Sequence, residues 1–444
     1  MNRKIFKKIK FVIFPTVLAL TTIGINSAYA VLIGNPIKLS EGTSSYASEP
    51  SLAYNSVDQE YIAVWKNVTM GFQTLTSQRF TTTGSLIEGN INLFPRKLSV
   101  IFGPVIAYNS TDNQYLVSFG VQGNPIFPYN SSVGQLITAD SELIGDNFLI
   151  SSAAQEISLL YNPQVNKYLQ TARAFDPDSI YPSNIILGQR IKSDGTLINS
   201  NIRLDTSNES GPNGQVALDS VHNRYLATWR DQGSSFGSNY TLQGRFINAD
   251  SGLISKQFEI VPPPDFKSGT TPLIPIRTSF DPISQKFLVV YGLANDTQIR
   301  GHFLDENGRP IGSDIILDRN FTYDNFSVTF NKTLQVYLVA WTSDSGLIGQ
   351  FIGTSGNIIG DRFTIASGIK SSVIANIANN DLGEFVIAWQ TQGTQAGIFA
   401  QRINTSSSSI PEPSTIFGIG VILAALPMLK KEYATRNKKA LEKV

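Results

Sequence analysis

The sequence predicts an all-β protein made of seven copies of one four-stranded unit, and three observations support this. An aromatic residue followed by an aliphatic one recurs seven times between Tyr61 and Phe385, at intervals of 48 to 62 residues. All four tryptophans lie four residues after the aromatic of their unit. No amphipathic helical pattern of useful length occurs between residues 31 and 404. Four-stranded repeats of about 50 residues are typical of propeller blades, so we predict a seven-bladed β-propeller over 31–404.

The units can be aligned on the aromatic that begins the second strand of each. These aromatics are Tyr61, Tyr115, Tyr168, Tyr225, Phe287, Tyr337 and Phe385. The residues six positions earlier are Asn55, Asn109, Asn162, Asp219, Asp281, Asn331 and Asn379. Asn and Asp side chains accept hydrogen bonds from backbone amides in tight turns. We therefore expect each of them to cap the turn between the first and second strands.

A third strand is expected to carry glycine, then Gln or Arg, then any residue, then Ile or Phe, as in the segments that begin with Gly188-Gln189 and Gly349-Gln350. A glycine turn then leads to a fourth strand, for example over 359–365. Side chains alternate along a strand, so each aromatic and the tryptophan four positions later point the same way. Because aromatic residues recur at these two positions along the units, we expect them to pack blade against blade rather than to bind a ligand.

The two ends of the repeat region predict how the ring closes. The seventh unit ends at Arg402-Ile403 without a fourth strand, and the chain begins with a strand-like segment, 33–39. We expect this N-terminal strand to complete the last blade. The alternative is an open stack of four-stranded units, which would leave sheet edges exposed.

The N-terminus has the pattern of a secretory signal. Five basic residues lie in 1–10, an apolar run covers 11–25, and Ala28-Tyr29-Ala30 follows. This order predicts a signal peptide over 1–30 that is cleaved after Ala30. The alternative is a retained anchor, although the run is shorter than the ~20 residues that a spanning helix prefers.

The C-terminus begins with a serine-rich linker, 405–410, followed by Pro411-Glu412-Pro413, an apolar segment at 416–429 and a basic tail. This order resembles the PEP-CTERM sorting signal of Gram-negative bacteria. We expect the sorting signal to occupy 411–444; the resemblance itself covers about 411–431 and implies cleavage near Pro411, Glu412 and Pro413 by an exosortase-type membrane protease. It also implies transient membrane contact through 416–429 and release to the cell surface or extracellular matrix. The 15-residue tail is longer than usual, and an uncut single-pass anchor is the alternative.

Composition excludes several classes of function. The chain has no cysteine and only two histidines, His222 and His302, so thiol chemistry is excluded and a histidine-rich metal centre is not expected. Without residues 1–30 and 411–444 it has 24 Lys and Arg against 31 Asp and Glu, a net charge of −7. Such an acidic body is not expected to bind nucleic acid.

The units differ most between their second and third strands. From the residue four after the aromatic to the Gln, Arg or His of the third strand, the intervals are 13, 16, 17, 16, 11, 9 and 12 residues. The long loops of units two to four contain our candidate ligand-binding residues, which combine aromatic rings with carboxylates. They are Phe127, Tyr129, Asp176, Asp178, Tyr181, Phe236 and Tyr240.

No catalytic residue, metal ligand or cofactor is predicted. The acidic loops lack the spacing of a calcium-binding motif, and Asp176 and Asp178 lie two residues apart, as in an ordinary solvated turn. The sequence favours an exported protein that binds polysaccharide or envelope proteins without catalysis. One alternative is a secreted glycosidase or lyase that uses the loop carboxylates, and another is a purely structural matrix component.

Overall fold

The computed structural model describes residues 28–41, 46–69, 72–93, 100–122, 130–152, 154–176, 184–206, 210–213, 215–231, 241–261, 276–293, 298–319, 325–369, 374–380, 382–393 and 396–407. The regular elements in these ranges are all β-strands, and they form seven antiparallel sheets. The predicted all-β class is therefore confirmed. No helix in the described part of the chain is long and apolar enough to cross a membrane. The predicted apolar segment 416–429 lies outside the described residues.

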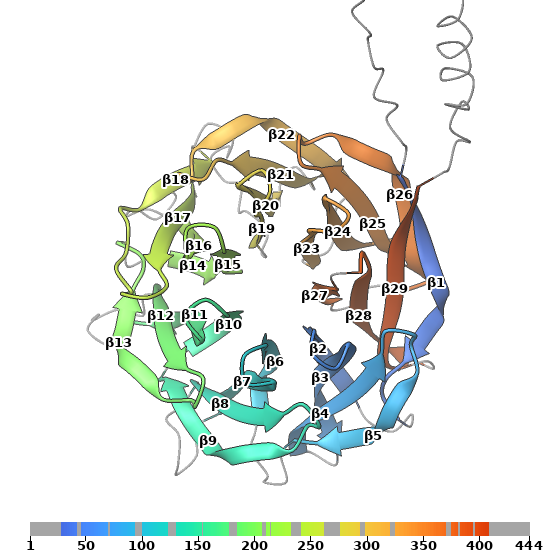
Figure 1. The fold of residues 1–444 in the computed structure, drawn as a ribbon, viewed down its shortest axis with the longest axis horizontal. Helices are drawn as coiled ribbons and strands as arrows, with labels where there is room; N and C mark the ends of the chain where they lie inside the picture. The colour runs from blue at the N-terminus through green and yellow to red at the C-terminus, as the bar shows by residue number, and fades with distance from the viewer. Residues whose placement is uncertain are drawn as a thin grey trace, which may run out of the picture. The chain divides into compact units, whose positions relative to one another are not determined.

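Each sheet is one blade, and the blades follow one another around a ring (Figure 1). Blade 1 contains β2 (Tyr46–Asn55), β3 (Glu60–Thr69), β4 (Phe72–Thr81) and β5 (Leu86–Asn92). Blade 2 contains β6 (Val100–Asn109), β7 (Gln114–Val121), β8 (Ser131–Thr138) and β9 (Leu143–Ser151). Blade 3 contains β10 (Ala154–Asn162), β11 (Lys167–Phe175), β12 (Asn184–Lys192) and β13 (Leu197–Arg203).

Blade 4 has its innermost strand in two pieces, which both pair with the second strand. It contains β14 (Ser210–Asn213), β15 (Ala217–Asp219), β16 (Arg224–Asp231), β17 (Thr241–Asn248) and β18 (Phe258–Val261). Blade 5 contains β19 (Ile276–Asp281), β20 (Lys286–Leu293), β21 (Gln298–Leu304) and β22 (Pro310–Asp318). Blade 6 contains β23 (Phe326–Asn331), β24 (Val336–Ser343), β25 (Gly346–Gly353) and β26 (Ile358–Ser367).

Blade 7 closes the ring with strands from both ends of the described chain. Its strand order is β27 (Ile374–Asn379), β28 (Phe385–Thr391), β29 (Gly397–Ser407) and β1 (Ala28–Lys38). The Leu39 amide donates to the Ile398 carbonyl at 2.8 Å, which extends the pairing past the end of β1. The predicted closure by an N-terminal strand is confirmed (Figure 1).

The repeated aromatics form the core between blades, as the sequence analysis expected. Trp65, Trp229, Trp341 and Trp389 are at most 2% exposed. In blade 1, Tyr61 and Trp65 pack against Ala388 of blade 7. Ile62, on the opposite side of the same strand, packs against blade 2. Every second strand is thus covered on both sides, and buried aromatics of 150–250 Å² each supply much of the contact.

A glutamine of the third strand holds the fourth strand in five blades. In blade 6, Gln350 Nε2 donates to the carbonyls of Phe351, Ile359 and Gly360 at 3.0–3.2 Å. The fourth strand bulges at this point, where Gly360 has a φ of 64°. The glutamines with the same contacts are Gln78, Gln135, Gln189, Gln350 and Gln401. In blade 7 the contact crosses the closure, because Gln401 bonds the Ile33 carbonyl of β1.

The alternating strands give the ring two different faces. We call the face with the first-to-second and third-to-fourth strand turns the turn face; it includes 56–59 and 82–85. We call the opposite face, where second strands end and first strands begin, the loop face. In the innermost position around the ring lie β2, β6, β10, β14/β15, β19, β23 and β27 (Figure 1).

Candidate functional site on the loop face

The turn face is built from the predicted Asn and Asp caps. In blade 1, Asn55 Oδ1 accepts the amides of Val57 and Asp58, both at 2.9 Å. The same Oδ1-to-amide capping is made by Asn109, Asn162, Asp219, Asp281 and Asn331. The prediction is confirmed in these six blades.

In blade 7 the predicted cap is wrong by one residue. Asn380, rather than Asn379, accepts the amides of Leu382 and Glu384. Asn379 instead donates to Thr329 Oγ1 at 3.0 Å. The turn of this blade is one residue shorter than the others, so the cap stands five residues before Phe385. A fixed spacing from the aromatic therefore selected the wrong asparagine.

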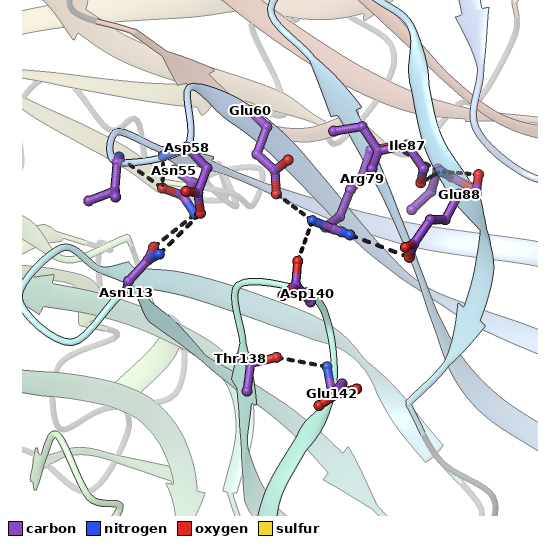
Figure 2. Close-up of polar contacts among 12 residues, drawn as sticks. Asn55, Asp58, Glu60, Arg79, Ile87, Glu88, Asn113, Thr138, Asp140 and Glu142 are labelled. Carbon is purple, nitrogen blue, oxygen red and sulfur yellow. Dashed lines mark hydrogen bonds and ion pairs between the residues drawn. The ribbon is translucent and has the colours of Figure 1, made fainter.

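The capping amides also join neighbouring blades (Figure 2). Asn55 Nδ2 donates to Asn113 Oδ1 of blade 2 at 3.0 Å, and Asn113 Nδ2 donates to Asp58 at 3.1 Å. The pairs Asn109–Asn166 and Asn162–Asn223 repeat this contact. Asp219 and Asp281 have no amide to donate, and the next units have Gln285 and Gln335 at the partner position.

Arg79 makes a second turn-face contact between blades 1 and 2 (Figure 2). Its guanidinium lies 3.1 Å from Glu60, 3.3 Å from Glu88 and 3.0 Å from Asp140 of blade 2. Burial raises the pKa of the Glu60 carboxyl even though Arg79 opposes the shift. Long polar side chains reach the turn of the following blade at other interfaces too: Gln114 to Ser193, Arg190 to Asp250, Arg224 to Glu306 and Lys286 to Thr354. Much of the polar chemistry of the turn face thus holds the ring together.

On the loop face, the structure describes one of the seven candidate ligand-binding residues. That residue is Asp176, which directly follows β11. The other six lie outside the described residues: Phe127, Tyr129, Asp178, Tyr181, Phe236 and Tyr240. The sorting residues Pro411, Glu412 and Pro413 also lie outside them, whereas Ala30 lies in β1.

Asp176 belongs to a charged group that sequence reasoning missed. Its carboxylate is 8% exposed and lies 3.6 Å from the Arg203 guanidinium. Arg203 Nε also bonds the fully buried carboxylate of Asp205 at 3.1 Å. The Arg203 side chain is itself 40% exposed. Two buried carboxylates therefore orient one accessible cation.

An exposed aromatic directly precedes Asp176 in the chain. Phe175, the last residue of β11, is 39% exposed, although large apolar side chains are usually buried. The group can be found by aligning the units by strand register. The position that Arg203 occupies in blade 3 is occupied by Asn92 in blade 1 and by Leu149 in blade 2, so the charge is not part of the repeated pattern. We define Phe175, Asp176, Arg203 and Asp205 as the blade 3 group.

Blade 5 contains a second charged group, at positions that form the neutral pairs Gln78–Asn90 in blade 1 and Gln135–Asn147 in blade 2. His302 replaces the third-strand glutamine, and its Nδ1 lies 2.6 Å from Asp314 Oδ1. Arg300 and Tyr291 reach the other oxygen of Asp314 at 3.0 and 3.1 Å. Burial alone would raise the pKa of Asp314, but the contacts from His302, Arg300 and Tyr291 outweigh it and lower this pKa. Tyr291 is almost completely buried, and the side chains of His302, Arg300 and Asp314 are 12–18% exposed, so the group is mostly but not fully buried.

The described residues contain no set of three or more His, Asp or Glu side chains placed to hold a metal ion. His222, the other histidine, contacts the Asp219 carboxylate at 2.9 Å in a turn of the turn face.

Comparisons with known proteins identify the fold and not a family. No family model and no curated protein matches the chain. Among solved structures, polysaccharide lyase Uly1 is similar with a TM-score of 0.55 and 8% identity, over 84% of this chain and 99% of that one. The WD40 domain of Toxoplasma gondii coronin gives 0.53 and 11%, over 88% of each chain. A Dyadobacter fermentans protein of unknown function gives 0.51 and 8%, over 86% of this chain and 100% of that one.

Proposed function

We propose that this protein is an exported, non-catalytic β-propeller that binds polysaccharide through its loop face. The observation behind the proposal is the blade 3 group, which combines an exposed aromatic ring with an exposed, oriented arginine. It occurs in one blade, whereas the turn-face contacts recur between blades.

The chemistry of this group suits a sugar. An aromatic face stacks on the apolar side of a sugar ring, and a guanidinium offers five donors to hydroxyl or carboxylate oxygens. Asp176 and Asp205 hold Arg203 in place, so less side-chain entropy is lost on binding. The carboxylates face Arg203 and are nearly inaccessible, which favours binding over acid–base catalysis.

The cellular location forms part of the same proposal. The predicted signal peptide and the resemblance of about 411–431 to a PEP-CTERM signal support export, exosortase processing and a place at the cell surface or in the extracellular matrix. The acidic body, with its net charge of −7, supports a partner other than nucleic acid.

Binding of the purified protein to immobilised polysaccharides tests the function. We expect Phe175→Ala to weaken binding at least tenfold. Leu253→Ala removes a more exposed side chain, 75% accessible, from the turn face and serves as the matched control. Equal binding by both variants would contradict the proposed site, and binding to envelope proteins alone would contradict the ligand class.

The enzymatic alternative is tested on the same polysaccharides by assaying for released reducing or unsaturated ends. We expect no turnover. Turnover that Asp176→Asn abolishes would replace the binding proposal with a carbohydrate-active enzyme.

A further inference from the structure

The innermost strands of neighbouring blades are joined by side chains four residues before the turn cap. Ser51 Oγ accepts the Ile106 amide of the next blade at 3.2 Å, and Asn376 Oδ1 accepts the Leu52 amide at 2.9 Å. Ser158 and Ser327 make the same contact, with Val216 at 3.1 Å and with Ile377 at 3.0 Å. At four interfaces, then, this position supplies an acceptor to the amide of the next innermost strand.

Blade 5 has Arg277 at this position, four residues before Asp281. A guanidinium has only donors, so Arg277 offers no acceptor to the equivalent amide in blade 6, that of Val328. Ser279, on the same side of β19, bonds the Phe330 amide at 2.9 Å, which shows that this side of the strand faces blade 6. At the interface of blades 5 and 6, a donor side chain therefore faces a donor amide, whereas the four interfaces described above pair that amide with an acceptor.

No carboxylate among the described residues forms an ion pair with Arg277. Its guanidinium makes one hydrogen bond, from Nη1 to the Ile276 carbonyl at 3.1 Å. Burial lowers the pKa of Arg277 to about 10, and Glu156 of blade 3 only partly opposes this. Glu156 is already paired with Arg173 at 2.9 Å. Arg277 as a whole is only partly buried, so the residue is not sealed off from solvent.

Two other blades contain complete ion pairs near the loop face, although at strand positions other than that of Arg277. Lys66 contacts Glu49 in blade 1, and Arg173 contacts Glu156 in blade 3, each at the loop-face end of its interface. Arg277 is thus a cation at the loop-face end of an innermost strand, and no described carboxylate forms an ion pair with it.

We propose that Arg277 is the centre of an oxyanion site near the ring axis on the loop face, and that it binds the carboxylate or sulfate of an acidic polysaccharide. The inference rests on the proposed function and narrows its ligand class to acidic sugars. Carboxylate and sulfate groups both present an anionic oxygen that accepts hydrogen bonds from the guanidinium. Uronate and sulfate ester are the two sources that the experiment separates.

The test measures the melting temperature of the purified protein at constant ionic strength, with glucuronate, glucose 6-sulfate or glucose added. We expect an anionic sugar to raise the melting temperature by mass action, whereas glucose does not. Arg277→Gln should abolish the rise, and Arg277→Lys, which keeps the charge, should retain part of it. Arg309→Gln removes the same charge from an exposed turn-face position and is the matched control.

A rise with glucuronate alone assigns a carboxylate, and a rise with glucose 6-sulfate alone assigns a sulfate. No rise with either sugar, or equal rises in wild type and Arg277→Gln, would overturn the site. A folded Arg277→Gln protein is recognised by an unliganded melting temperature at or above that of wild type, because an unpaired buried charge has been removed.

The polymer assay separates failure of this site from failure of the proposed function. If wild type binds polysaccharide through Phe175 but Arg277→Gln has no effect on small anions, the oxyanion site is wrong and the function stands. If small anions act through Arg277 while no polysaccharide binds, the function is wrong and the site stands.

Discussion

Two tryptophans in the same register show how one polar contact can distinguish repeated residues. Trp341 Nε1 donates to the Asp318 carboxylate at 2.8 Å. Trp229 is equally buried, but its indole N–H has no hydrogen-bond partner within the described residues. The sequence pattern predicted the packing of both side chains. It could not predict the hydrogen bond, because Asp318 lies in the preceding blade at the end of the variable fourth strand.

We expect Trp341→Phe to lower the free energy of unfolding by about 1–3 kcal/mol more than Trp229→Phe. Both changes remove similar apolar volume, but only the first removes one of the donors to the mostly buried Asp318 carboxylate, which also accepts the Arg319 amide and contacts Arg362. Urea unfolding of the two variants measures the difference. Equal losses would show that the indole contact contributes nothing to stability.

The contacts of Asp314 predict that the free energy of unfolding depends on pH. Its contacts lower the pKa of Asp314 in the folded protein. The stabilisation is therefore fully present above the ordinary pKa of an aspartate and is lost as the pH falls through the lowered value. We expect Asp314→Asn to destabilise the protein at pH 7 and to cost progressively less in acid, as measured by urea midpoints.

Asp361→Asn is the control for this pH series, because Asp361 is exposed on the fourth strand of blade 6. A loss in Asp314→Asn that is the same at every pH would contradict the assigned role of the carboxylate.

At the level of strands, sequence periodicity predicted most elements, and the exceptions have physical causes. The N-terminal strand was predictable because the seventh unit lacked a fourth strand. The division of the inner strand of blade 4 into β14 and β15 was not expected. It coincides with Pro212 and Gly214, the first of which has no amide to donate and the second of which weakens strands.

The hydrogen bonds of Gln401 are expected to hold the closing strand, β1, against β29. Gln401→Ala removes bonds to the carbonyls of Ile33 and Gly34. We expect faster amide hydrogen exchange throughout β1, because no short covalent turn connects β1 to β29. Gln350→Ala removes the same contacts in blade 6, where β25 and β26 are joined by the turn at 354–357, and we expect a smaller effect there. Equal effects would mean that the closure is no weaker than an ordinary pair of strands.

At the scale of the ring, closure was predictable from the sequence, but the proposed ligand site was not. The long loops pointed to blades 2 to 4, and of their candidates the structure describes Asp176. Arg203 and Arg277 stand out only when the units are aligned by strand register, because each is an ordinary charged residue within its own strand. A pattern of repeats identifies shared packing, whereas a binding site depends on departures from the repeat.

Removing residues 28–38 tests closure at this scale. We expect the loss of β1 to expose β29 and to cause aggregation or the loss of cooperative unfolding, because the edge of blade 7 is left unpaired. A circular permutant with residues 28–41 joined by a short turn after Thr405 keeps every strand, and we expect it to fold. Cooperative unfolding of the deletion variant, measured by calorimetry, would show that the ring does not depend on β1.

The pairing of β1 with β29 also sets an order of events during biosynthesis. A ribosome makes β1 before every other strand of the body and β29 last, so this blade stays incomplete until the final strand has emerged. If the chain crosses a membrane unfolded, the ring forms on the far side only after nearly all of it has passed. Ala30 lies within β1, so a peptidase that cuts there would need to act before that strand docks.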